Sequence, residues 1–306
     1  MEVFTSPPES HALVEERDLQ VDGRSESGSL AGTSDWTIHP VYRPHEQKGL
    51  AQIMSREFEN RTAIVTGGGS GIGRATALRL ASSGANVVVA DIHAETANAV
   101  VAEIVASGGV SMAVIGDLSE QSVVDQLVSA TISAYGAIDV LVNNAGIMDD
   151  MSGPHEVSDA MWERVIRINL TAPFLLTRAV VPHMLARGKG AIVNTASEGG
   201  LRGSAAGTAY TVSKHGVVGL TRSSAVVYRD KGIRVNAVAP GGVSTNLEIN
   251  FNAESTGLAV IGEHAVNVGR IAQADEIANA IAFLASDAAS NINGAILPVD
   301  NGWSAV

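Results

Sequence analysis

The sequence has no cysteine, little positive charge and few aromatic residues. Among its 306 residues, the absence of cysteine excludes disulfides, thiolate catalysis and cysteine-bound metals. Lysine and arginine number 20 against 32 aspartates and glutamates, a net charge of −12 that argues against nucleic-acid and anionic-membrane partners. Apolar runs stay short of the roughly 18 residues that a membrane-spanning helix needs. We expect a cytoplasmic α/β protein with a large core, since 45% of the residues are hydrophobic and 32 are glycine.

The N-terminal segment differs in composition from the rest of the chain. Residues 1–53 hold nine acidic and four basic residues, lack a sustained periodicity and contain no apolar run typical of a secretory signal. Such a segment buries too little apolar surface to offset its ordering entropy, so we predict a disordered extension over residues 1–57. Two alternatives remain: a functional arm, or a tag, leader or misassigned start ahead of Met54.

From Thr62 onward, short runs rich in valine and isoleucine alternate with amphipathic segments. Such runs are typical of strands buried on both faces, and the alternation predicts a doubly wound, mostly parallel sheet with helices on both faces. Strands are expected at residues 62–66, 86–91, 111–116, 139–143, 191–195, 233–239 and 295–299, and helices at 71–83, 120–135, 208–229 and 275–286. We therefore predict one seven-stranded Rossmann-type domain over residues 58–306. The strand-free stretch 241–274 is expected to be a lid or binding loop.

A glycine-rich turn follows the first expected strand and opens a helix, reading Thr-Gly-Gly-Gly-Ser-Gly-Ile-Gly over residues 66–73. Glycines there permit a tight turn and let the backbone approach a pyrophosphate at the helix N-terminus. Because the run lies between a strand and a helix, it predicts dinucleotide binding. The residues expected to contact the cofactor are Gly67, Ser70, Gly71, Ile72 and Gly73.

Asp91 ends the second expected strand, about 20 residues after the glycines. A carboxylate at this point accepts hydrogen bonds from a ribose 2′-hydroxyl and repels a 2′-phosphate. Ser70 and Ile92 are uncharged where a cation would be needed for NADP, so NAD is the expected cofactor. The alternative is that Asp91 only caps the helix beginning near Ala94.

Tyr210 and Lys214 are four residues apart in an expected helix, so their side chains share one face. A nearby ammonium stabilises a phenolate and lowers its pKa, which allows the tyrosine to exchange a proton with a substrate oxygen. Ser197 follows a strand end 13 residues before Tyr210, where its hydroxyl can hold a carbonyl oxygen. These three residues are the predicted catalytic set.

With these motifs in order along the chain, the sequence resembles the short-chain dehydrogenase/reductase family, in its branch of single-domain enzymes of about 250 residues. The resemblance covers residues 58–303. Its further marks are Asp117-Leu118, Asn143-Asn144-Ala145-Gly146, Asn169 and Pro240-Gly241. Near the C-terminus, residues 299–302 resemble the family's Val-Asp-Gly-Gly, with Asn301 in place of a glycine, and asparagine tolerates left-handed geometry.

The resemblance implies a role for each matching residue. Asp117 and Leu118 would contact the adenine, and Asn144, Ala145 and Gly146 would line the adenosine ribose. Asn169 would hold a water in a proton relay with Lys214, which would also hold the nicotinamide ribose. The stretch that begins at Pro240 and Gly241 would fix the carboxamide and phosphate end of the cofactor through Val243 and Thr245.

The expected reaction is NAD-dependent interconversion of a secondary alcohol and a ketone, in a homotetramer or homodimer formed through helices 173–187 and 208–229. A 3-oxoacyl-thioester reductase and a non-catalytic dinucleotide sensor are the alternatives. The lid, residues 246–267, has apolar residues, three glutamates, no lysine or arginine, and Gly257 and Gly262 as hinges. It therefore suits a small or medium neutral substrate.

Other polar residues fit less specific roles. His183, His215 and His264 lack ligand spacing, so no metal site is expected. Asp149 and Asp150 fit a polar loop. Glu198, directly after the serine, either faces the substrate or is exposed.

Overall fold

The computed structural model describes residues 56–245 and 251–306. Nearly all of the predicted N-terminal extension, and residues 246–250 of the predicted lid, lie outside the described residues. The described part carries all seven predicted strands, each within one residue of its expected bounds.

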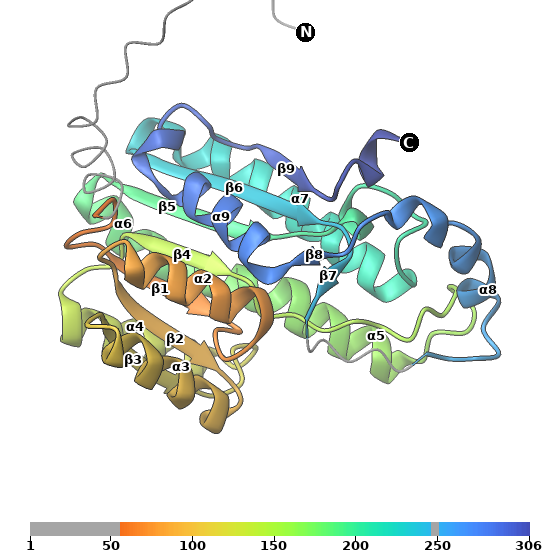
Figure 1. Cartoon of the computed structure of the whole chain (residues 1–306), viewed down its shortest axis with the longest axis horizontal. Coiled ribbons are helices and arrows are strands. Elements are labelled where there is room, and N and C mark those ends of the chain that lie inside the picture. Colours follow the sequence, from red (N-terminus) through yellow and green to blue (C-terminus); the bar gives the residue numbers. More distant parts are fainter. Residues whose placement is uncertain (1–55, 246–250) are drawn as a thin grey trace, which may run out of the picture. The chain divides into compact units, whose positions relative to one another are not determined.

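A parallel sheet of seven strands forms the centre of the fold, in the order β3-β2-β1-β4-β5-β6-β9 (Figure 1). Successive strands run outward from β1 in one direction and then, from β4, in the other, so the carboxyl ends of β1 and β4 flank the switch point where ligands of such sheets bind. The strands are β1 (Thr62–Thr66), β2 (Asn86–Asp91), β3 (Val110–Ile115), β4 (Val140–Asn143), β5 (Gly190–Thr195), β6 (Ile233–Pro240) and β9 (Ile296–Val299).

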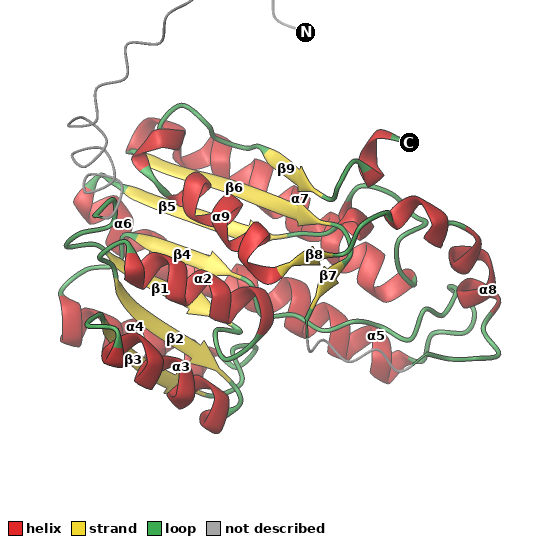
Figure 2. Ribbon diagram, in the orientation of Figure 1, coloured by secondary structure: helices red, strands yellow, loops and turns green. Residues whose placement is uncertain are grey.

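Helices cover both faces of the sheet (Figure 2). Buried apolar side chains of α2 (Gly71–Ser82), α3 (Ala94–Ala106) and α9 (Ala274–Ala285) form one core cluster with the strands. Those of α4 (Gln121–Tyr135), α6 (Ala172–Arg187) and α7 (Thr208–Tyr228) form the other. The five inner strands, β2, β1, β4, β5 and β6, are buried on both sides, which explains why valine and isoleucine dominate them without an alternating pattern.

The stretch expected to lack strands contains a small second sheet. β7 (Val243–Ser244) pairs in parallel with β8 (Ala272–Gln273), and Ala272 N–H donates to the Gly242 carbonyl at 2.8 Å. Strands of two residues give no periodic signal, which is why the sequence did not predict them. The pair brings together the two ends of the lid, which contains α8 (Thr256–Glu263) and a 3₁₀ turn, η4 (Ala265–Val268).

One helical stretch is continuous from α5 (Asp159–Ile166) through a π-helical segment, η1 (Arg167–Thr171), into α6. In the described residues, it alone is long and apolar enough to cross a membrane, with 29 residues and a mean hydropathy of 1.2. Its α6 part supplies Leu176, Val180 and Met184 to a core cluster against the sheet. We therefore interpret it as a core helix.

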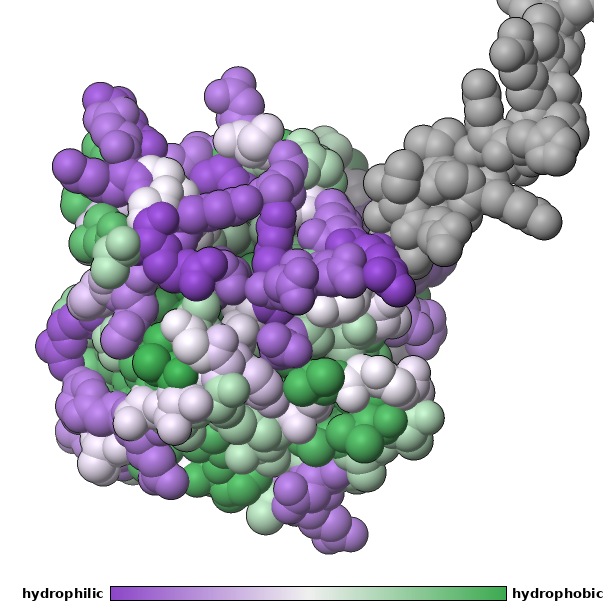
Figure 3. All heavy atoms as spheres, turned by 90° about the vertical axis from the view of Figure 1, so that its left-hand side faces the viewer, coloured by the Kyte–Doolittle hydropathy of each residue, from purple (hydrophilic) through white to green (hydrophobic). Residues whose placement is uncertain are grey.

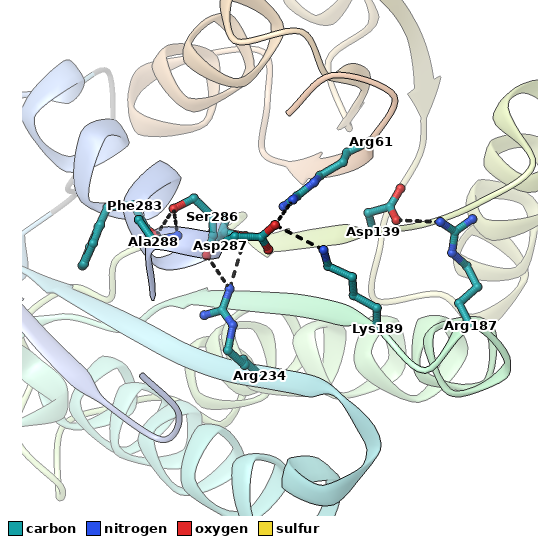
Figure 4. Close-up of polar contacts among 10 residues, drawn as sticks. Arg61, Asp139, Arg187, Lys189, Arg234, Phe283, Ser286, Asp287 and Ala288 are labelled. Atoms are coloured by element: carbon teal, nitrogen blue, oxygen red, sulfur yellow. Dashed lines mark hydrogen bonds and ion pairs between the residues drawn. The ribbon is translucent and has the colours of Figure 1, made fainter. Parts of the chain in front are cut away.

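Charged side chains tie the amino ends of several strands to the end of α9 (Figure 4). Asp287, in the turn η5 (Asp287–Ala289), accepts hydrogen bonds from Arg61 and from Lys189, which precede β1 and β5. Arg234 of β6 donates to the carbonyls of Leu284 and Ser286 at 2.7 and 2.8 Å, which satisfies acceptors that the helix end leaves open. Hydrophilic side chains gather over the upper part of the face seen in Figure 3, with hydrophobic patches below them.

Candidate active site

The turn between β1 and α2 brings backbone atoms closer together than side chains would allow. Gly67 has φ +60°, a conformation that favours glycine, and a Cβ on Gly73 would lie 2.0 Å from the Gly67 carbonyl oxygen. A Cβ on Gly71 would lie 3.2 Å from the side chain of Thr245, so β7 and the turn meet here. Ser70 is the N-cap residue of α2. The space above the turn suits a phosphate group at the start of α2.

Asp91 faces the glycine-rich turn. Its Oδ2 accepts the backbone N–H of Gly69 at 2.9 Å, and its Oδ1 accepts that of His93 at 3.0 Å. The N-cap residue of α3 is His93, so Asp91 is not the cap of that helix. Ser70 and Ile92 beside it are exposed. Neither Ser70 nor Ile92 therefore adds a charge beside the Asp91 carboxylate.

Asp117 follows β3 and lies in a network of hydrogen bonds. Its Oδ1 accepts the backbone N–H and the hydroxyl of Ser119 at 2.9 and 2.6 Å, and Arg167 lies 3.3 Å from its Oδ2. Partial burial raises the pKa of Asp117, but these bonds and the arginine charge outweigh it, so the pKa lies below its ordinary value. Leu118 beside it is buried. Arg167 had no signal in the sequence, since its partners lie far away in the chain.

The turn after β4 is hydrogen-bonded to the turn after β1. Thr66 Oγ1 accepts the backbone N–H groups of Asn144 and Ala145 at 2.9 and 3.0 Å, and Asn144 Nδ2 donates to the Thr66 carbonyl at 3.0 Å. Next to them, a Cβ on Gly146 would lie 3.2 Å from Asn169 Oδ1 and 3.5 Å from Lys214 Nζ. The glycine thus connects the cofactor side of the site with the predicted catalytic residues.

Ser197, Tyr210 and Lys214 come together at the carboxyl end of β5. Ser197 is the N-cap of the turn η2 (Glu198–Gly200), and its hydroxyl forms a hydrogen bond with the Tyr210 phenol. Lys214 Nζ donates to the Thr195 carbonyl at 2.8 Å and lies 5.5 Å from the centroid of the Tyr210 ring. Tyr210 and Lys214 are 9% and 4% exposed. The three predicted catalytic side chains are therefore adjacent, with Tyr210 and Lys214 buried and Ser197 partly exposed.

The pKa of Tyr210 differs from the sequence-based expectation. Burial raises it, the Asp149 carboxylate raises it further, and only the hydrogen bond from Ser197 lowers it. We expected Lys214 to lower this pKa, and that prediction was wrong for the protein alone, because loss of hydration penalises the phenolate more than nearby groups stabilise it. Burial also lowers the pKa of Lys214 to about 8.

Asn169 lies in the π-helical segment η1, a type of irregularity that is frequent at functional sites. Its Oδ1 accepts the Ile147 N–H and its Nδ2 donates to the Ile147 carbonyl, both at 2.9 Å. Nδ2 also lies 3.2 Å from Ser213 Oγ on α7. The side chain therefore joins the turn after β4 to the helix that carries Tyr210. That Asn169 holds a water in a proton relay with Lys214 stays a prediction.

The end of β6 lies against the C-terminal segment. Pro240 is buried, Gly241 N–H donates to the Val299 carbonyl at 3.2 Å, and a Cβ on Gly241 would lie 3.0 Å from Asp300. Val243 continues into β7. Asn301 has φ +56°, the left-handed conformation that we expected it to tolerate.

Glu198 neither faces solvent nor lies free beside a substrate. It is 1% exposed, its Oε2 lies 2.9 Å from Arg202 Nε, and the carboxylate of Asp300 lies close enough to affect its charge. Burial raises the pKa of Glu198 to about 7, and Asp300 adds to the effect. This pair could not be predicted from the sequence because its two carboxylates are about a hundred residues apart.

An apolar wall lies against Tyr210. Met151 and Ala206 are buried with the tyrosine, and Leu258 and Ile261 of α8 pack against them. The lid thus presents apolar side chains to the site, as predicted. Gly257, however, is not a hinge: it lies inside α8, and a Cβ there would be 2.4 Å from the Met151 carbonyl oxygen. Close packing explains the glycine.

Two acidic residues next to this wall, Glu156 and Asp149, were assigned no function from the sequence. Glu156 receives hydrogen bonds from Ser255 and Thr256 at the start of α8, between 2.6 and 2.9 Å, and these hold the pKa of its carboxyl far below the ordinary range. Asp149, expected in a polar loop, is 2% exposed and hydrogen-bonded to the start of α7. The start of α8, which contacts Glu156, and the start of α7, which contacts Asp149, are both distant from these residues in the sequence.

The described residues contain no cluster of side chains suited to a metal ion.

Comparison with known proteins decides the family. The family model described as Enoyl-(Acyl carrier protein) reductase matches residues 67–304. Cyclohexanol dehydrogenase of Acinetobacter sp. (strain SE19) is 44% identical over 256 residues, which cover 83% of this chain and 99% of the relative. The chain belongs to the short-chain dehydrogenase/reductase family.

Other relatives and solved structures agree. Cis-4-hydroxycyclohexanecarboxylate dehydrogenase of Sinomonas cyclohexanicum is 44% identical over 253 residues, covering 83% of this chain and 100% of the relative. The crystal structure of levodione reductase superposes with a TM-score of 0.75 at 39% identity, covering 81% of this chain and 99% of that one. A structure from Beutenbergia cavernae that is described as an NAD(P)-dependent gluconate 5-dehydrogenase, with NADP bound at low occupancy, has a TM-score of 0.73 at 39% identity, covering 82% of this chain and 100% of that one. This member of the family is an oxidoreductase of CH–OH groups that uses a nicotinamide dinucleotide.

Proposed function

We propose that this protein is an NAD-dependent dehydrogenase of small or medium, uncharged secondary alcohols, cyclic ones included. The observation that carries the proposal is the Ser197–Tyr210–Lys214 set, in which Tyr210 and Lys214 are buried and Tyr210 packs against an apolar wall. Such a site offers an alcohol a proton acceptor and apolar contact, and the described part of the lid, residues 251–267, offers a phosphate or carboxylate no lysine or arginine. The names of two relatives, which concern cyclohexanol and levodione, fit this class, and a third relative, named for cis-4-hydroxycyclohexanecarboxylate, shares the cyclic secondary alcohol but carries a carboxylate.

Each residue of the site has a part in this reaction. Tyr210 would take or give the hydroxyl proton, while Ser197 holds the substrate oxygen. Lys214, fixed by the Thr195 carbonyl, would support the phenolate and bind the nicotinamide ribose, and Asn169 would complete the proton relay. The nicotinamide, when bound, accepts or donates the hydride, and the protein supplies position and electrostatics.

The residues around the glycine-rich turn fit a dinucleotide. Gly67, Gly71 and Gly73 allow the close packing of this turn at the start of α2, where a phosphate would bind, and Thr245 lies beside Gly71. We assign the preference to NAD because Asp91 places a carboxylate at this turn and neither Ser70 nor Ile92 supplies a cation. The NADP-bound relative makes cofactor titration necessary as a test of this preference.

A panel of substrates tests the proposal. Uncharged secondary alcohols with NAD should give a higher kcat/KM than 3-oxoacyl thioesters with NADPH. Tyr210→Phe, which removes one hydroxyl, should keep the fold and NAD binding but lose activity by about a hundredfold or more. Reduction of an acetoacetyl thioester with NADPH and no activity on neutral alcohols would indicate the thioester reductase instead. Cofactor binding without turnover of any substrate would indicate the sensor.

We also propose a homotetramer or homodimer. Phe174 and Leu185 of α6 and Val212 of α7 are 44%, 40% and 42% exposed, so both helices present large apolar side chains at the surface. Burial of these helices between subunits would cover them. Light scattering at micromolar concentration tests this, and a monomer would contradict it.

A further inference from the structure

The helix that carries Tyr210 begins without a capping side chain of its own. Its N-cap residue is Gly207, and Asp149 takes over the capping from the loop after β4. Asp149 Oδ1 accepts the Gly207 N–H at 3.2 Å, and Oδ2 accepts the Tyr210 N–H at 2.9 Å. Tyr210 is the third residue of α7, whose N–H a capping side chain ordinarily receives. A Cβ on residue 207 would lie 2.6 Å from Asp149 Oδ1, so the glycine makes room for this carboxylate.

The same carboxylate holds part of the apolar wall. Asp149 Oδ1 accepts the N–H of Met151 at 3.1 Å, and Met151 has φ +65°, a left-handed conformation that a methionine rarely adopts unsupported. In this conformation the Met151 side chain is buried against Tyr210. The next residue, Ser152, accepts the Thr208 N–H through its carbonyl at 3.1 Å, a second link between this loop and the first turn of α7.

The charge of Asp149 also acts on the site. It is 2% exposed and raises the pKa of Tyr210, in opposition to the Ser197 hydrogen bond. Burial raises the pKa of Asp149 itself, its three backbone hydrogen bonds lower it, and Asp150 raises it. The remaining charged group next to Tyr210 among the described residues is Lys214 on α7, while α8 contributes apolar side chains.

We propose that Asp149 is a positioning residue. It fixes the position of the Tyr210 hydroxyl through the start of α7, and it fixes the position of Met151 in the apolar wall. This inference rests on the proposed function, because it assigns to Asp149 both the rate of the tyrosine step and the fit of an apolar substrate. The effect on the rate of the tyrosine step acts through the cap on α7, so it should change kcat. The effect on the fit of the substrate acts through Met151, so it should change the KM for the alcohol. The KM for NAD should not change, because Asp149 contacts none of the residues that we assign to the dinucleotide except Tyr210.

Three variants separate the two effects. Asp149→Ala should lower kcat at least about tenfold and raise the KM for an apolar alcohol. In Asp149→Ala with Gly207→Ser, the serine supplies a local cap in the space that the carboxylate leaves. This double variant should recover most of the lost kcat but keep the high KM, because Met151 N–H still has no acceptor. Asp150→Asn is the matched control; its carboxylate accepts the Ser152 N–H and does not touch α7, so both constants should stay near wild type.

Asp149→Asn adds a readout that does not depend on turnover. It keeps the size of the side chain and one accepting oxygen but removes the charge, so the pKa of Tyr210 should fall. Ultraviolet difference titration against Tyr210→Phe isolates this residue among the four tyrosines. The inference is overturned if folded Asp149→Ala keeps wild-type kcat and KM, if the double variant recovers no kcat, or if the Tyr210 pKa does not move. A wild type that turns over no alcohol refutes the proposed function instead, and the titration still tests Asp149.

Discussion

The carboxylate of Asp91 accepts the backbone N–H of Gly69 at 2.9 Å, which joins the end of β2 to the glycine-rich turn. We predict that Asp91→Asn narrows the preference for NADH over NADPH by about tenfold, equivalent to about 1.4 kcal/mol, because repulsion of a 2′-phosphate is lost. Binding titrations with both cofactors measure it. Glu95→Gln, which removes an exposed charge from the first turn of α3, is the control and should leave the ratio unchanged. Equal affinities in the wild type would contradict the prediction.

The second prediction concerns the buried ammonium of Lys214. Burial lowers its pKa to about 8, so at pH 7 the folded state holds a charge at a cost in stability. Lys214→Met should therefore be inactive but more stable at pH 7 by about 1 kcal/mol, after allowance for the open Thr195 carbonyl.

The pH dependence of this gain follows from the two pKa values. Between pH 8 and 10.5 the unfolded wild type binds a proton that the folded one has lost, so wild-type stability rises and the advantage of the variant fades. Thermal unfolding at pH 7 and pH 10 measures both parts. Lys231→Met, at an exposed position, is the control. A variant less stable than wild type at pH 7 would show that the hydrogen bond outweighs the cost of the charge.

The third prediction concerns Glu198, whose raised pKa of about 7 means that the folded state keeps a proton that the unfolded state releases near pH 4.5. Stability should therefore fall as the pH rises from 4.5 to 7 and change little above that. Glu198→Gln removes this fall and should be more stable than wild type above pH 7, by about 1–3 kcal/mol. Melting temperatures from pH 5 to pH 8 test it, with exposed Glu163→Gln as control. Parallel curves for wild type and variant would contradict it.

The fourth prediction concerns the end of α9. Arg234→Met removes the donors to the Leu284 and Ser286 carbonyls and should destabilise the fold by about 2 kcal/mol or more, since acceptors are left open next to the sheet. Denaturant unfolding measures the loss. Arg229→Met removes an arginine whose side chain is 66% exposed, and it should cost far less. Equal losses in the two variants would mean that net charge, rather than the open carbonyls, is responsible.

Much of this fold could be predicted from the sequence because its inner strands are buried on both faces. Continuous valine and isoleucine runs then mark each strand, and the glycine-rich turn fixes the place of β1. Tyr210 and Lys214 could be paired because a spacing of four places two side chains on one side of a helix. The preference for NAD and the role of each predicted site residue stay predictions.

What the sequence did not predict depends on contacts between distant segments. Asp149 meets Tyr210 across 61 residues, and Glu156 meets Thr256 across 100. The pKa of Tyr210 was predicted in the wrong direction because spacing indicates the neighbours of a side chain but not how much water it loses. β7 and β8, with two residues each, are too short to show a pattern.

The capping of α7 by Asp149 has a consequence for the order of folding. A helix with its own capping residue can complete its first turn from local interactions, whereas this one needs a loop of about 60 residues to close first. The middle of α7 can form early, but the turn that holds Tyr210 becomes complete only after β4 and the loop beyond it have docked. A chain that is still folding therefore contains the helix before it contains a correctly placed tyrosine.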